Sequence, residues 1–126
     1  MAALERTHEG ISPAWSLLPD PRRMVMRYLK RDDTLVLVLT PPRPAESVDV
    51  DGAFWVRVIP TTGQTVGVEV EDFCSVFLPN HPELRPLWDS RPATQGRDGS
   101  HSPEARRFVA QFVHYFNRLL EQGVPV

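Results

Sequence analysis

The feature that most constrains the fold is a series of short apolar stretches between residues 24 and 72. The series ends at Val66 to Glu71, where valine alternates with glycine or glutamate. Strict alternation is typical of a β-strand with one face in the core and the other exposed. The pattern therefore predicts a sheet, although it indicates no particular chemistry.

Five strands are expected, and turn residues separate them: 24–29, 34–39, 46–50, 54–59 and 64–71. A four-residue polar loop between the first two strands predicts a hairpin that pairs Leu29 with Thr34. The strand 34–39 is apolar on both faces, so we expect it inside an antiparallel sheet, with 46–50 at an edge. The shared face of the valines places Arg57 opposite Gly67 or Glu69, which predicts a salt bridge across the exposed face.

A helix is predicted at 103–122. Ser102 and Pro103 provide an N-cap and a first-turn proline, and Gly123 is a suitable C-cap. Apolar residues at three- and four-residue spacing form one stripe, which packs on a sheet face; they are Ala105, Phe108, Val109, Phe112, Phe116, Leu119 and Leu120.

A chain of 126 residues suits a single domain of the α+β class. We divide it into an N-terminal arm at 1–21 that docks on the domain, a sheet at 22–78, a proline-rich connector at 79–102 and the helix. Leu84, Leu87 and Trp88 have helical spacing, so the first half of the connector should form a short helix that docks.

Composition and targeting signals point to a cytoplasmic protein. The chain is 41% hydrophobic and 24% charged, and it contains neither a signal-like opening nor a long apolar run. Its single cysteine, Cys74, cannot form an internal disulfide, which agrees with a reducing compartment. The apolar surroundings favour a small buried residue at Cys74 over a nucleophile.

No metal or cofactor is expected. The four histidines, His8, His81, His101 and His114, lack ligand spacing. The sequence carries neither a nucleophile elbow nor a phosphate-binding loop. His114 is better explained as a residue at the edge of the helix than as a catalytic base, because no carboxylate or nucleophile is spaced beside it.

One carboxylate pair could serve a small hydrolase. Glu69 and Glu71 are two apart on an expected strand, so both would face the same side about 7 Å apart. Trp55 is the aromatic residue expected near them. The simpler interpretation is a charged, solvated sheet face, and no catalytic residue is assigned.

Charge is distributed unevenly, although the net charge is only −2. Residues 22–31 carry five cations, whereas 46–72 carry acids with Arg57 as the single cation. The cations could contact the phosphates of a nucleic acid, with Tyr28 stacking on a base, or they could pair within the sheet, between subunits or with another partner; they are Arg22, Arg23, Arg27, Lys30 and Arg31.

The span 24–70 resembles a small, uncharacterised bacterial domain family whose members carry Tyr-Asp, Asp-Ala-Leu-Tyr-Ile and Val-Gly-Ile-Glu-Ile. The matching residues here are Tyr28, Asp33 to Leu37, Glu46, Gly52 and Val66 to Val70. Leu29 stands where members have Asp, and Arg57 lies near a position that is commonly acidic. The resemblance implies a compact antiparallel module with a regulatory or antitoxin-like role, and it implies no catalytic residues.

The sequence thus favours a non-catalytic protein-interaction or regulatory module that forms a homo-oligomer or binds a protein partner. A nucleic-acid-binding regulator that uses the basic stretch 22–31 is the alternative, and the small hydrolase is the third hypothesis.

Overall fold

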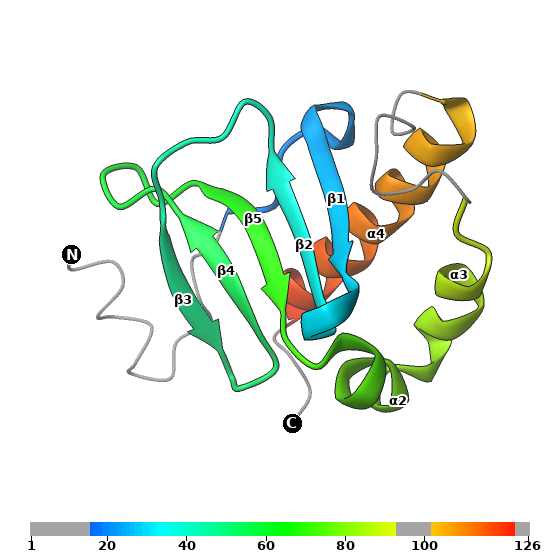
Figure 1. The fold of residues 1–126 in the computed structure, drawn as a ribbon. Helices are drawn as coiled ribbons and strands as arrows, with labels where there is room; N and C mark the ends of the chain where they lie inside the picture. Colours follow the sequence, from blue (N-terminus) through cyan, green and yellow to red (C-terminus); the bar gives the residue numbers. More distant parts are fainter. Residues whose placement is uncertain (1–15, 93–101, 123–126) are drawn as a thin grey trace.

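The computed structural model describes residues 16–92 and 102–122, and the described part contains one five-stranded antiparallel sheet (Figure 1). The strand order is β1-β2-β5-β4-β3, which places β5 in the middle and β1 and β3 at the edges. The strands are β1 (Met24–Leu29), β2 (Thr34–Leu39), β3 (Glu46–Val50), β4 (Phe54–Val58) and β5 (Thr65–Val70). The α+β class, the interior position of β2 and the edge position of β3 are confirmed.

The register agrees with the alternation of the sequence. Leu29 pairs with Thr34 and Met26 with Leu37, as the polar loop predicts. Arg57 lies opposite Gly67, one of the two expected positions. Three strand ends differ from the prediction: Ile59 lies outside β4, where a bulge shifts the register next to Val58, and Gln64 lies before the start of β5. Glu71 lies outside β5, because Asp72 adopts a left-handed conformation that ends the strand.

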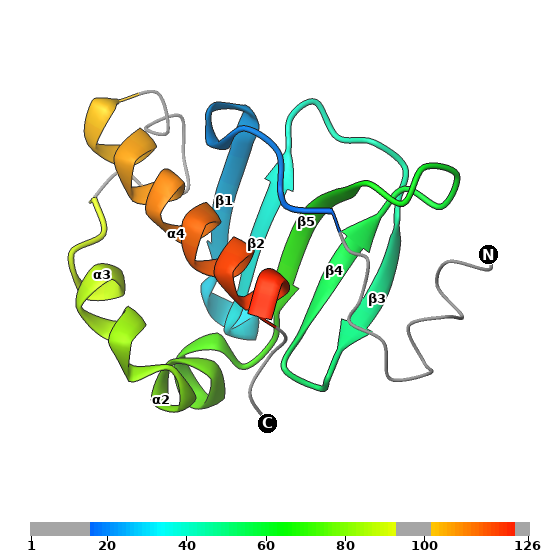
Figure 2. The ribbon, with the colours of Figure 1, turned by 180° about the vertical axis from the view of Figure 1, so that it is seen from behind.

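One long helix, α4 (Pro103–Gln122), covers one face of the sheet (Figure 2). The predicted N-cap is confirmed, since the Oγ of Ser102 accepts a hydrogen bond from the backbone N of Ala105 at 3.1 Å. The predicted stripe is buried, together with Val113 and Tyr115. The proposed C-cap, Gly123, lies outside the described residues.

A run of short helical turns follows β5, whereas the sequence predicted sheet to residue 78 and a connector beyond it. The run consists of η3 (Phe73–Phe77), a π-helical turn, then α2 (Leu78–Asn80), η4 (Pro82–Leu84) and α3 (Arg85–Asp89). Leu84 and Trp88 are buried, which confirms that the first half of the connector docks as helix. Residues 93–101 of the expected connector lie outside the described residues.

Aromatic side chains join this helical run to α4 and the sheet. The Trp88 ring lies with its centroid 6.1 Å from that of Phe112 in α4, and the rings of Phe54 in β4 and Phe116 in α4 are 5.3 Å apart. Edge-to-face and tilted pairs of this kind add to the free energy gained from burial of the rings. The core therefore lies between one face of the sheet and the helices.

The described part of the arm packs on the same side of the sheet as α4 (Figure 2). Leu18 is buried, and its backbone N donates to the Oδ1 of Asn117 in α4 at 2.7 Å. The Oγ of Ser16 accepts from the backbone N of Thr65 at 2.6 Å. Residues 1–15 of the arm, including His8, lie outside the described residues. A short turn, η1 (Pro21–Arg23), leads into β1.

Candidate functional site

No described helix packs on the other face of the sheet (Figure 1). We call it the open face and define it by the residues that alternate with the core positions of the strands. They are Val25, Arg27, Val36, Val38, Ser47, Asp49, Trp55, Arg57, Gly67 and Glu69. All except Gly67 are half-buried or exposed, so this face offers both apolar and charged groups to solvent.

The strand register arranges the open face in two rows that cross all five strands. The first row runs in the order Arg27, Val36, Glu69, Trp55 and Asp49. The second row runs in the order Val25, Val38, Gly67, Arg57 and Ser47. The first row therefore begins with a cation on one edge strand and ends with an anion on the other.

Gly67 allows the Arg57 side chain to lie close to the sheet. A Cβ at position 67 would be 3.2 Å from the Cδ of Arg57 and 3.0 Å from the Cγ1 of Val38. The ion pairs among the described residues are Arg22–Asp20 and Arg85–Asp89. The predicted salt bridge from Arg57 to Glu69 is therefore absent. The stem of Arg57 instead lies against Gly67, which is buried beneath it and Val38.

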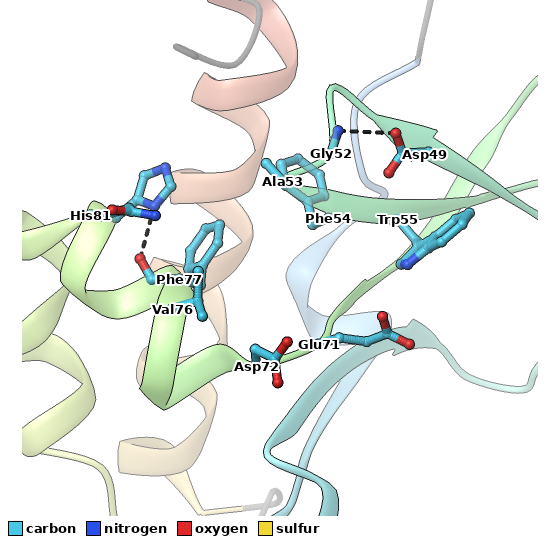
Figure 3. Close-up of a pocket in the computed structure, with 11 residues that line it drawn as sticks. Asp49, Gly52, Ala53, Phe54, Trp55, Glu71, Asp72, Val76, Phe77 and His81 are labelled. Atoms are coloured by element: carbon cyan, nitrogen blue, oxygen red, sulfur yellow. Dashed lines mark hydrogen bonds between the residues drawn. The ribbon is translucent and has the colours of Figure 1, made fainter.

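A hollow of about 190 Å³ lies beside one end of the open face, between the β3–β4 turn and the start of η3 (Figure 3). Glu71 and Asp72 lie on one side of it, and Trp55 and Asp49 lie on the other. Val76, half exposed, adds an apolar wall. We call this site the acidic hollow. It contains three carboxylates and an indole ring, a combination that suits a cationic group.

The two glutamates of the hydrolase hypothesis do not share one site. Glu71 lines the acidic hollow, whereas Glu69 lies on the open face and is not among the residues that line the hollow. The backbone turns after Val70, so the expected spacing of two residues along one strand does not apply to this pair.

The five predicted basic residues are all exposed, and they are distributed along the edge strand β1. Arg22 and Arg23 precede the strand, Arg27 lies on the open face, and Lys30 and Arg31 follow in the turn η2 (Lys30–Asp32). Arg22 is paired with Asp20 at 2.7 Å. Hydrogen bonds from the Arg22 side chain and backbone lower the pKa of Asp20 to about 2.

A polar cluster around Asp33 was not predicted. Its Oδ1 accepts from the Tyr28 hydroxyl at 2.7 Å and from the backbone N of Cys74 at 2.8 Å. Its Oδ2 accepts from the backbone N and the hydroxyl of Ser75 at 3.1 and 2.9 Å. Burial alone would raise the pKa of Asp33, but these hydrogen bonds outweigh it and lower the pKa to about 2.

This cluster accounts for Cys74, which is half-buried rather than fully buried as expected. Its backbone N is fixed by Asp33, and its thiol lies near the Tyr28 hydroxyl. The signals in the sequence were Tyr28 and Asp33, which the family resemblance matched. Neither residue could be linked to Cys74 from spacing, because more than forty positions separate the partners.

A second polar site joins η4 to α4. The Tyr115 hydroxyl donates to Oε2 of Glu83 at 2.5 Å, and this bond lowers the pKa of Glu83. Burial, with the same bond, raises the pKa of Tyr115. The Nδ1 of His81 lies 3.0 Å from the carbonyl oxygen of Phe77, which it can reach as a donor, and its ring stacks on the Phe77 ring. His114 is exposed on α4, where the sequence placed it.

The polar sites around Asp33 and Glu83 link elements of the fold. Among the described residues, no three His, Cys, Asp or Glu side chains are grouped so that they could hold a metal ion. None of the described helices has the length and apolar character needed to cross a membrane. Comparison with family models, curated proteins and solved structures finds no match to this chain.

Proposed function

We propose that this domain is a non-catalytic protein-interaction module that binds a protein through the open face. The observation that carries the proposal is a sheet face with Val36, Val38 and Trp55 only partly covered, although the other face is sealed by helix and arm. Apolar residues bordered by charges are typical of surfaces that bind other proteins.

The chemistry of the described residues supports binding rather than catalysis. The pKa values of Asp33 and Glu83 are lowered by hydrogen bonds that hold elements of the fold together. Neither carboxylate has the raised pKa of a general acid at neutral pH. A regulatory or antitoxin-like role, as the family resemblance implies, would use the same kind of surface.

Site-specific photocrosslinking in the source cells tests the proposal. A benzophenone amino acid placed at position 38 should give discrete higher-mass adducts that contain a protein. The same group at position 107, where Arg107 is exposed on α4, is the matched control and should not give these adducts. Val36→Glu combined with the position-38 probe should abolish the adducts, because a charge is introduced among the apolar residues of the surface.

Two results would count against a protein-binding open face. One is the absence of any protein adduct from position 38 at native expression. The other is an identical set of adducts from positions 38 and 107, since binding would then not depend on which face is presented.

Nucleic-acid binding is the second candidate, and the exposure of all five cations along β1 favours it. It predicts a gel shift with DNA or RNA that weakens as salt rises and weakens further in the Arg22→Ala, Arg23→Ala double variant. Arg107→Ala, which removes a cation from α4, is the control. The absence of a shift at low salt would eliminate this candidate.

A further inference from the structure

We propose that the partner of the open face is a second copy of the chain, related by a two-fold axis that runs parallel to the strands, above β5 and between the two sheets. In this arrangement, the basic edge strand β1 of each copy faces the acidic hollow of the other. The inference rests on the proposed function, because it names the partner for the same surface.

The first step is the charge on the two edges of the sheet. On the β1 edge, Arg27, Lys30 and Arg31 are exposed. On the β3 edge, Glu46, Asp49 and Asp51 are exposed. The middle strand β5 separates the two edges, and four strand spacings of about 4.8 Å place them about 19 Å apart.

The second step is the choice of axis. Two sheets that pack face to face keep their strands roughly aligned. An axis parallel to the strands places β1 of one copy over β3 of the other, whereas an in-plane axis perpendicular to the strands places β1 over β1. The first arrangement brings opposite charges together and the second brings like charges together, so charge complementarity selects the first.

The third step is the position of the turns. The antiparallel order places the β1–β2 turn, the β3–β4 turn and the end of β5 at the same end of the sheet (Figure 1). A two-fold axis parallel to the strands places this end of one copy over the same end of the other. Lys30 and Arg31 of one copy therefore face the acidic hollow of the other, while Arg27 faces Asp49. A guanidinium in the hollow can contact its carboxylates and the Trp55 ring.

The fourth step is the centre of the interface. Since β5 is the middle strand, the axis brings the two copies of Gly67 together and also the two copies of Glu69. The paired Glu69 carboxylates repel each other, so this arrangement makes the unusual prediction that Glu69→Gln strengthens the dimer.

A charge-swap experiment tests the arrangement by sedimentation velocity between about 1 and 200 µM. We expect a wild-type dissociation constant on the order of 10 µM, which lies within this range. The Arg27→Glu, Arg31→Glu variant and the Asp49→Lys, Glu71→Lys variant should each dimerise at least about tenfold more weakly. An equimolar mixture of the two should restore the wild-type affinity to within about threefold, because both contacts are then between opposite charges.

Further measurements complete the test. Arg107→Glu, on the opposite side of the molecule, should leave the dissociation constant unchanged, and 0.5 M salt should weaken the wild-type dimer. Thermal unfolding of each variant verifies that it is folded. If the Asp49 change prevents folding by removing the bond from Asp49 Oδ2 to the Gly52 backbone N, then Glu71→Lys alone replaces it.

Three outcomes would overturn the inference. They are a monomeric wild type at 200 µM, variants that do not restore each other, and a Glu69→Gln dimer weaker than wild type. A monomer that still gives protein adducts from position 38 would remove the second copy as partner and leave the proposed function standing. Loss of the position-38 adducts as well would remove both.

Discussion

At the scale of single residues, Thr65 carries a buried polar group that is not satisfied by a hydrogen bond. Its side chain is fully buried, yet its Oγ1 has no hydrogen-bond partner. The backbone N of the same residue donates to Ser16, so only the hydroxyl lacks a hydrogen-bond partner. A buried hydroxyl without a partner costs free energy that burial of a methyl group would not.

Thr65→Val should therefore raise the free energy of unfolding by about 1 kcal/mol, because the shape is kept and the unsatisfied hydroxyl is lost. Urea unfolding measures the change. Thr34→Val is the matched control, since the buried Thr34 hydroxyl donates to the carbonyl oxygen of Asp32 at 3.1 Å. That control should lose about 1 kcal/mol. Equal losses in both variants would show that the Thr65 hydroxyl has a stabilising partner.

At the scale of elements, Asp33 acts as a remote cap for the helical run that follows β5. Its carboxylate accepts from the backbone N of Cys74 and Ser75, and its carbonyl oxygen accepts from the backbone N of Phe73. First-turn N–H groups of a helix lack partners within the helix. Here a residue of the β1–β2 turn provides those partners, and its left-handed backbone directs it toward them.

Asp33→Asn should lower the free energy of unfolding by about 2 kcal/mol at pH 7, since the charged acceptor is lost. The pKa of Asp33 is about 2 in the fold against 3.8 for the free group. A lowered folded-state pKa stabilises the fold above the unfolded-state value, and this contribution is lost as pH falls from about 4 to about 2. The difference between wild type and variant should therefore shrink over that window.

Urea unfolding at several pH values measures this difference. Asp32→Asn is the control, because the neighbouring Asp32 side chain is exposed. It should change stability little and show no such pH dependence relative to wild type. A gap between wild type and Asp33→Asn that stays constant down to pH 2 would contradict the role of the Asp33 charge.

The elements that could be predicted are those whose signals are local. The four-residue polar loop predicted the register of β1 with β2, and the stripe and Ser102 located α4. The turns at Phe73–Phe77 could not be predicted, because their cap comes from Asp33, far away in sequence. The acidic hollow was missed for the same reason, since it joins Asp49 and Trp55 to Asp72 and Val76 only through the tertiary fold.

At the scale of the whole molecule, the arm closes the core that sheet and α4 leave open at one end. Leu18 is 6% exposed and tied to Asn117, whereas the adjacent Leu17 is 42% exposed. Docking of an apolar arm could be predicted from its composition. Which of the two leucines docks could not, because this depends on where Asn117 and Thr65 present their polar groups.

Leu18→Ala should therefore cost about 2 kcal/mol of unfolding free energy, through lost burial and the cavity left behind. Leu17→Ala should change stability by less than about 0.5 kcal/mol, because Leu17 is largely in solvent. Thermal or urea unfolding of the pair gives a direct comparison between neighbouring residues of the same type. A similar loss in both variants would mean that the arm does not dock through Leu18.

The two tyrosines of the chain, Tyr28 and Tyr115, each donate a hydrogen bond to a carboxylate. Burial and that bond raise the pKa of both above the usual 10.0. Each therefore stays protonated in the fold well into alkaline solution, and the fold loses this contribution as pH rises above about 10. Tyrosinate absorbance then appears only as the structure opens, so this absorbance reports the alkaline unfolding of the protein. Tyr28→Phe and Tyr115→Phe would show how much of the absorbance change comes from each tyrosine.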